Sequence, residues 1–244
     1  MNTGLSNMDC GLGPRAAPRN DDPGYAYVCK SPSEEDQDLL WAALLAGIAG
    51  YVDAICYLRL GGAFAANMTG NLVEVGLAAA QGQWGDALWC ASLLASFLFG
   101  VLAARLVLRT QHSARLSLLL EAAIVLAAAT GVLGIAAVPV LAASMALQNE
   151  AVTHGIVALN VGFITGDLQT LGERLIPAAA PGEPRKRDNR VWLLLIILVF
   201  YAAGAAIGAL LAGWDEAALI LPAALLATAA LLPERWTGLA AERH

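Results

Sequence analysis

Residues 53–72 read DAICYLRLGGAFAANMTGNL, and this stretch decides the fold. Most of it is apolar enough to lie in a lipid bilayer, yet it begins with Asp53 and ends in the polar motif TGNL at 69–72. Polar and ionisable side chains are costly inside a membrane, so they usually mark a functional site there. We therefore expect residues 53–72 to fold within the membrane and to gather polar side chains at that depth.

A second stretch of the same kind begins at Asn149 and ends in the motif TGDL at 165–168, 96 positions after the first motif. Each stretch falls in the first two segments of a set of four apolar segments. The first set comprises 39–60, 62–80, 87–104 and 116–135, and the second comprises 136–154, 156–176, 191–214 and 217–232. Such internal repeats are typical of membrane transporters, whose binding sites lie between the two halves.

The composition points to a membrane protein. Of the 244 residues, 58% are hydrophobic and 14% are charged, whereas a soluble domain has about 45–50% apolar and about 25% charged residues. Residues 1–38 differ from the rest, because they hold almost no apolar run and end in an acidic stretch, so we expect a disordered acidic tail. The chain has no basic face, which excludes nucleic acid as a partner. The sequence therefore predicts an all-α integral membrane protein in contact with membrane lipid.

The charges of the loops predict the topology. Loops 106–115 and 177–190 carry basic residues and are expected on the cytoplasmic side, whereas 136–139 is uncharged and 215–216 is acidic, so both are expected outside. The loop at 136–139 is expected outside and the loop at 177–190 inside, so the chain must cross the membrane an odd number of times between them. Yet two apolar segments lie within 136–176. This pair therefore makes one net crossing, as a discontinuous helix or as a span with a re-entrant segment.

The same reasoning applied to both halves predicts two inverted repeats of three net crossings each. The first repeat occupies 39–135 and the second occupies 136–235, which includes the cytoplasmic loop 177–190. A short C-terminal tail follows at 236–244. An even total of crossings places both termini on the same side, which the loop charges identify as cytoplasmic.

Asp53 is the first candidate functional residue. A carboxylate at the centre of a membrane helix costs roughly 2.5–3.5 kcal/mol on insertion scales, so it should face the interior of the bundle and have a partner. One interpretation is a carboxyl group that binds a proton or a cation. The other is a structural acid that pairs with Arg59 or caps a helix.

The two motifs supply the other candidate residues. Thr-Gly suits a helix start or an unwound joint, because Thr can cap a helix and Gly allows close approach of backbones. Two such joints could form a polar substrate site, or their side chains could hold the two halves together by hydrogen bonds between helices. Glu150 and His154 could likewise relay protons or form a pair at the membrane interface. The candidate substrate-binding residues are Asp53, Asn67, Thr69, Gly70, Asn71, Glu74, Gln148, Asn149, Glu150, Thr165, Gly166 and Asp167.

Catalytic and metal-binding motifs are absent from the sequence. No Ser/His/Asp constellation, HExxH, Walker loop or GxGxxG occurs, and the four cysteines show no CxxC spacing. We therefore expect no catalytic residues, no metal and no cofactor. The chain is not expected to be an enzyme.

Four short patterns together resemble a known family. GYVDA, NMTGNL, MALQNE and ITGDL occur in this order, as in the YoaK-like bacterial membrane proteins, and the resemblance covers roughly residues 40–235. Ala146 stands where the family pattern has a glycine. The resemblance implies a compact, multi-pass protein of the bacterial inner membrane with undefined activity.

Two functional hypotheses follow. The first is a small secondary transporter of a polar small molecule or ion, with a central site between the repeats. Its transport could be coupled to the movement of a proton or another cation. The alternative is a non-transporting membrane module that assembles with a protein partner or lipids. Assembly into a homo-oligomer stays open under both hypotheses.

Overall fold

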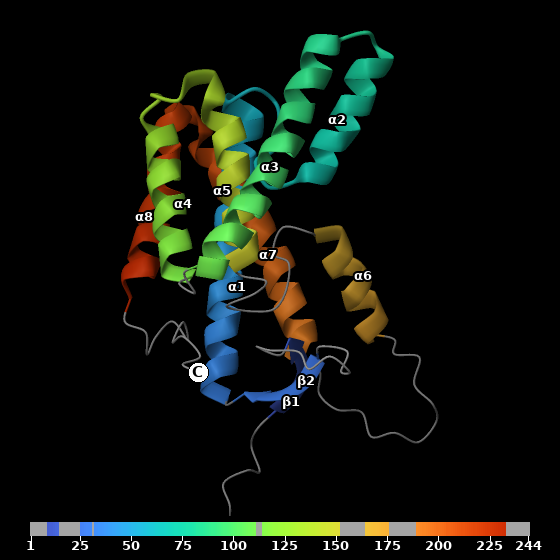
Figure 1. Cartoon of the computed structure of the whole chain (residues 1–244), viewed down its shortest axis with the longest axis vertical. Helices are drawn as coiled ribbons and strands as arrows, with labels where there is room; N and C mark the ends of the chain where they lie inside the picture. The colour runs from blue at the N-terminus through green and yellow to red at the C-terminus, as the bar shows by residue number, and fades with distance from the viewer. Residues whose placement is uncertain are drawn as a thin grey trace, which may run out of the picture.

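The computed structural model describes residues 9–14, 25–30, 32–110, 114–151, 164–175 and 189–232 (Figure 1). The described elements from residue 32 onward are all helical, which confirms the all-α fold class. In chain order the elements are β1 (Asp9–Pro14), β2 (Tyr25–Lys30), α1 (Pro32–Arg59), α2 (Met68–Ala80), α3 (Trp84–Thr110), α4 (Ala114–Ala129), η1 (Gly134–Ala136), α5 (Ala137–Ala151), α6 (Ile164–Leu175), α7 (Asn189–Leu211), η3 (Ala212–Leu219) and α8 (Ile220–Leu231).

The eight helices α1 to α8 match the eight apolar segments predicted from the sequence, and α2 and α6 contain the two Thr-Gly motifs. The N-terminal region differs from the prediction of a disordered tail. There β1 and β2 form an antiparallel hairpin, with Asp9 opposite Lys30, and α1 begins at Pro32. The β2 sequence YAYVCK contains aromatic and β-branched residues, which favour a strand.

The helices pack in pairs that are distant in sequence. α1 packs against α7, α3 against α5, and α4 against α8, while the short helices α2 and α6 pack on α3 and α7. Figure 1 shows α2 and the adjoining part of α3 projecting at one end of the molecule, and α6 beside α7 further along the long axis. The two motif helices therefore follow one another along the long axis, on the same side of the bundle.

Three stretches of the described residues are long and apolar enough to cross a membrane: Leu39–Arg59, Trp84–Leu106 and Val191–Leu231. The last of these includes α7, η3 and α8. The helical path is broken inside it at Asp215, whose φ of 53° is unusual for a residue with a side chain. Figure 1 shows that α8 runs back alongside the bundle after this break.

Glycine allows the closest helix contacts. A Cβ atom added at Gly204 on α7 would lie 1.9 Å from the carbonyl oxygen of Gly47 on α1, and one added at Gly100 on α3 would lie 2.3 Å from that of Ala143 on α5. Both distances are far below van der Waals contact, so only glycine fits. Small residues bring membrane helices together in this way, because backbone contact gains dispersion energy.

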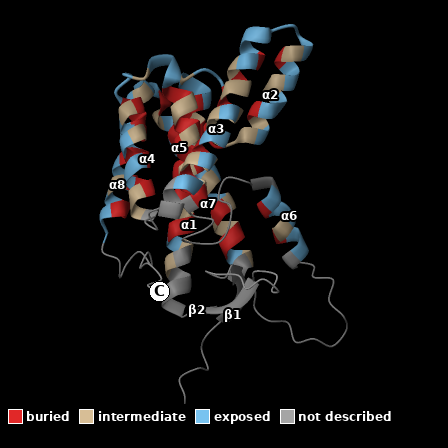
Figure 2. Ribbon diagram, viewed as in Figure 1, coloured by how far each residue is buried: buried red, intermediate tan, exposed pale blue. Residues whose placement is uncertain are grey.

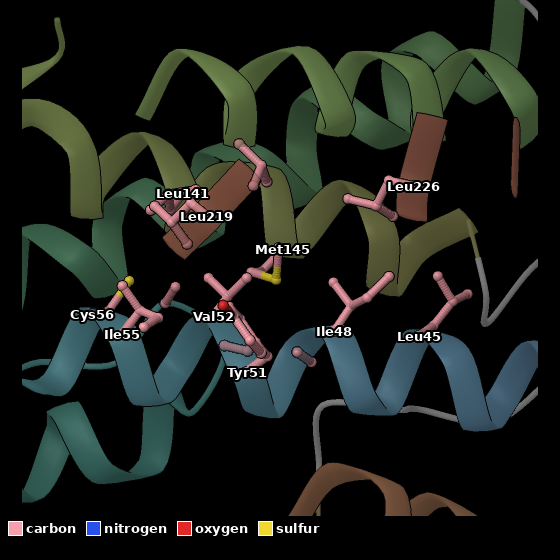
Figure 3. Close-up of a cluster of buried hydrophobic side chains, with 14 of the residues drawn as sticks. Leu45, Ile48, Tyr51, Val52, Ile55, Cys56, Leu141, Met145, Leu219 and Leu226 are labelled. Carbon is pink, nitrogen blue, oxygen red and sulfur yellow. The ribbon is translucent and has the colours of Figure 1, made fainter. Parts of the chain in front are cut away.

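The core of the bundle is formed by α1, α5, η3 and α8. Figure 3 shows Val52 and Ile55 of α1 facing Leu141 of α5 and Leu219 of η3, with Leu45 further along the same side of α1. These five side chains are completely buried. In Figure 2 the buried residues follow these helices, whereas α2 and the adjoining part of α3 are largely exposed or intermediate. The apolar core therefore lies in the main bundle, beside the two motif helices.

Polar contacts join the elements at both ends of the bundle. At one end Arg59 of α1 forms an ion pair with Asp215 of η3. At the other end Arg115 of α4 donates a hydrogen bond to the carbonyl oxygen of Leu232, just after α8, with 2.7 Å between nitrogen and oxygen. We call the Arg59 end the outer end and the Arg115 end the inner end, following the orientation predicted from the loop charges.

Candidate functional site

Asp53 of α1 lies at the centre of a hydrogen-bond network. Its carboxylate accepts from the backbone N–H of Ala66 at 2.6 Å and of Asn67 at 3.1 Å. A third bond, at 2.5 Å, comes from the hydroxyl of Tyr201 on α7. Asp53 is only 3% exposed, so it faces the interior and has a partner, as its cost in a membrane requires. The partner is not Arg59, which pairs with Asp215 instead.

The segment 60–67 between α1 and α2 is not helical, and it is this segment that Asp53 holds. Gly61 and Gly62 have φ values of 117° and 71°, a conformation that glycine adopts without steric cost. The chain then passes Phe64, whose backbone N–H donates to the Asn71 side chain at 2.9 Å and whose carbonyl accepts from it at 2.7 Å. Asn71 is completely buried on α2. The result is a non-helical backbone segment held by the side chains of Asp53 and Asn71.

The start of α2 explains the first Thr-Gly motif. Asn67 is the N-cap residue, and its side chain accepts from the backbone N–H of Gly70 at 3.2 Å. A Cβ atom at Gly70 would lie 2.9 Å from the Phe64 ring, so glycine makes room for that ring. Thr69 is exposed and Glu74 is half-buried on α2, and neither belongs to the Asp53 network.

The second set of polar residues begins at the end of α5. The Gln148 amide donates to the carbonyl of Leu45 on α1 at 3.1 Å, while the Gln148 carbonyl oxygen is buried without a hydrogen-bond partner. The Asn149 side-chain oxygen is likewise buried and unpaired. Glu150 forms an ion pair with Arg105 of α3 at 3.2 Å. This set therefore bridges α5 to α1 and to α3.

The α6 helix contains the second Thr-Gly motif. Asp167 is 5% exposed, and one of its carboxylate oxygens is buried without a hydrogen-bond partner. Gly166 is exposed, and its carbonyl accepts from the Thr170 hydroxyl at 2.9 Å. The side chain of Thr165 and the whole of His154 lie outside the described residues.

The two sets of polar residues occupy different levels of the bundle. Gln148 contacts Leu45, which lies eight residues before Asp53 on α1, and this spacing corresponds to about 12 Å along a helix. The structure therefore brings Asp53, Asn67 and Asn71 together near the outer end. It places the Gln148–Glu150 set nearer the inner end, with the apolar core of Figure 3 around α1 between them.

The half-buried Tyr201 and the buried Glu121 matter to the site but were not among the candidates predicted from the sequence. Tyr201 lies in a segment that is uncharged throughout, so only its proximity to Asp53 reveals its role. Glu121 of α4 is completely buried, and neither carboxyl oxygen has a hydrogen-bond partner. It is the only acidic residue in 116–135, a signal that the sequence offered. Across the described residues, no group of three or more His, Cys, Asp or Glu side chains could hold a metal ion.

Comparison with known proteins gives the family. The family described as "protein of unknown function (DUF1275)" matches residues 41–232, which is most of the chain. The chain belongs to the DUF1275 family. It is also 34% identical over 184 residues to the UPF0700 transmembrane protein YoaK of Bacillus subtilis (strain 168), covering 69% of this chain and 81% of that protein. No solved structure matches the chain.

These comparisons confirm the resemblance to YoaK-like membrane proteins that the four sequence patterns indicated. The chain is a membrane protein of a family of unknown function. The polar residues described above therefore have to carry any more specific functional proposal.

Proposed function

We propose that this DUF1275 protein is a small secondary carrier of a polar small molecule or ion, with its site at the interface of two inverted repeats. No catalytic step is part of the proposal. The observation that carries it is the Tyr201–Asp53 hydrogen bond, which joins the second half of the chain to the first beside the non-helical segment 60–67. Transporters place binding groups at broken helices between repeats, where backbone donors and acceptors can reach a solute.

The helix contacts support the inverted repeats. The first helix of each half packs on the third helix of the other half, because α1 contacts α7 and α5 contacts α3. The closest points also correspond. Gly47 and Ala143 are 96 positions apart, and Gly100 and Gly204 are 104 apart because the second half has a longer loop. The Gly47–Gly204 contact is thus the counterpart of the Ala143–Gly100 contact.

The two levels of polar residues suit alternating access. The Asp53 network lies toward the outer end and the Gln148–Glu150 set toward the inner end, while Val52 and Met145 lie in the apolar layer between them (Figure 3). Rocking one half against the other would open one level while the other stays closed. The Asp53–Tyr201 bond and the Glu150–Arg105 pair both connect the halves, so each is suited to hold one closed state.

Ligand binding tests this proposal directly. Purified protein would be subjected to thermal unfolding with a panel of inorganic ions, amino acids and small organic acids at two pH values. A transported ligand should raise the melting temperature of the wild type, because binding to the folded state stabilises it. Asp53→Asn should lose this response, since Asn cannot accept all three hydrogen bonds that the carboxylate accepts.

Transport in proteoliposomes would use the same ligand and two further variants. Thr69→Ala is the matched control for the motif, because Thr69 is exposed and lies outside the network. It should transport like the wild type. Full binding and transport by the double variant Asp53→Asn/Glu150→Gln would refute the carrier proposal.

One observation favours the alternative, a membrane module that assembles with a partner or with lipids. Asp53, Asn67 and Asn71 all bond to groups of their own chain, which is what structural side chains would do. Under this alternative, deletion of residues 1–35 should reduce co-purification with a partner more than Asp53→Asn does. The reverse order of effects would favour the carrier.

A further inference from the structure

Glu121 is a buried acid that the carrier described above does not use. It lies on α4, is 0% exposed, and has no hydrogen-bond partner at either carboxyl oxygen. Asp53 is as deeply buried but accepts three hydrogen bonds. The two carboxyl groups therefore have opposite surroundings, and the network that stabilises a negative charge at Asp53 is missing at Glu121.

The cost of burying a charge determines the protonation state of Glu121. An ionised carboxylate without a partner in an apolar interior is far more costly than a neutral polar group, so such a group takes up a proton or pairs with a positive charge. The helix packed most closely on α4 is α8, whose sequence ILPAALLATAAL has no titratable side chain. Glu121 must therefore be neutralised by a proton or by an incoming cation.

The charged groups on the other elements packed against α4 are either engaged elsewhere or acidic themselves. On α5 the only such group is Glu150, which pairs with Arg105. On η3 they are Asp215, which pairs with Arg59, and the neighbouring Glu216. Arg115, at the start of α4 itself, donates to the carbonyl of Leu232. None of these groups bonds to the Glu121 carboxyl, and a proton is the simplest way to neutralise it.

The position of Glu121 suits a role in transport. It is the eighth residue of the 16-residue α4, so it lies about 10–12 Å from either end of that helix. Ser117 lies one turn nearer the inner end on the same face and is also buried, whereas Val125 lies one turn nearer the outer end. Toward the inner end this face of α4 thus offers one hydroxyl group, next to the apolar Leu118, and toward the outer end it is apolar.

From these observations we propose that Glu121 is a proton-binding site at mid-depth in the bundle, which exchanges its proton with water at the inner end past Ser117. This deepens the carrier function and rests on it, because such a carboxyl would couple solute movement to a proton. The step moves one proton between water and the Glu121 carboxylate, and no other bond forms or breaks.

Infrared spectroscopy of the purified full-length protein tests the proposal without any solute. A protonated carboxyl group absorbs separately from a carboxylate, so Glu121→Gln should remove one acid band from the spectrum at neutral pH. Asp53→Asn should leave that band in place. Labelling of glutamate with ¹³C in the wild type should shift the same band, which identifies it as glutamate without any substitution.

Exchange into D₂O then separates a proton-binding site from a sealed structural acid. The Glu121 band should shift within minutes while the protein stays folded, and Ser117→Ala should slow this shift several-fold. The proposal would be overturned if the acid band were unchanged in both the Glu121→Gln and the ¹³C-labelled samples. It would also be overturned if the Glu121 band of the wild type stayed unshifted in D₂O for hours. Proton exchange without transport of any solute would leave this site standing and refute the carrier alone.

Discussion

The close contact of α1 with α7 predicts that a single added methyl group will disrupt the protein. In Gly204→Ala the new Cβ would lie 1.9 Å from the Gly47 carbonyl oxygen, whereas ordinary contact begins at 3.4 Å. The helices must therefore separate by about 1.5 Å at this point, and overpacking of this kind costs about 1–3 kcal/mol.

The separation should also break the hydrogen bond beside it. Tyr201 lies one turn before Gly204, so the 2.5 Å distance between its hydroxyl and Asp53 would lengthen to as much as about 4 Å. A hydrogen bond to a charged group contributes about 1.5–3 kcal/mol. The combined loss of stability is about 2.5–6 kcal/mol, which corresponds to a fall in melting temperature of roughly 5–24 °C for a chain of this size.

Thermal unfolding of three glycine variants in one detergent provides the measurement. Gly76→Ala is the control, because no atom lies within 4 Å of a Cβ at this position, and alanine favours a helix. It should be as stable as the wild type or slightly more stable. Gly100→Ala should fall between the two, since its Cβ would lie 2.3 Å from the Ala143 carbonyl and no carboxylate network is adjacent. A Gly204→Ala melting temperature equal to that of Gly76→Ala would refute the close packing of α1 and α7.

Three further predictions follow from other contacts. Asn71→Ala should lower stability by about 2–3 kcal/mol in thermal unfolding, because the backbone N–H and the carbonyl of Phe64 both lose their hydrogen-bond partner. Thr69→Ala serves as the control and should have no effect. A double-mutant cycle of Arg105→Ala and Glu150→Gln should give a coupling of about 0.5–1 kcal/mol in the free energy of unfolding, because the Arg105 side chain is 60% exposed. A coupling of zero would show that this pair does not link the two halves. Single cysteines at Gln83, in the turn between α2 and α3, and at Thr130, in the turn after α4, would be introduced into a cysteine-free background. Both should react with an impermeant thiol reagent from the same side of the membrane, because Figure 1 places these two turns at the same end of the molecule. Labelling from opposite sides would contradict the topology.

Much of the fold could be predicted because apolar length and loop charge act locally along the chain. The eight apolar segments correspond to the eight helices, and the polar motifs mark the two short ones, α2 and α6. Asp53 was expected to face inward because a membrane-buried carboxylate requires partners, and it does. The hairpin of β1 and β2 was missed because composition outweighed a short run of strand-forming residues.

The partners of the buried groups could not be predicted, because they depend on which helices meet. Tyr201 reaches Asp53 across 148 positions of sequence. Asn71 is a candidate substrate-binding residue from the sequence, and only the structure reveals that it bonds to the backbone of Phe64, seven residues away. Spacing on one helix reveals a shared face, but it does not reveal what lies opposite that face.

The difference between the two halves leads to a last prediction. Asn149 corresponds to Asp53 by 96 positions, and Phe97 corresponds to Tyr201 by 104, so the α1–α7 interface has an ionisable pair at these positions where the α5–α3 interface has none. If the inverted repeat holds, Asn149→Asp alone should destabilise the protein, because its carboxylate would be buried without a hydroxyl donor. Adding Phe97→Tyr should recover part of the loss, and a double-mutant cycle should show a favourable coupling of about 1 kcal/mol or more. Zero coupling would show that the second interface is not built like the first, and the carrier would then depend on the Asp53 side alone.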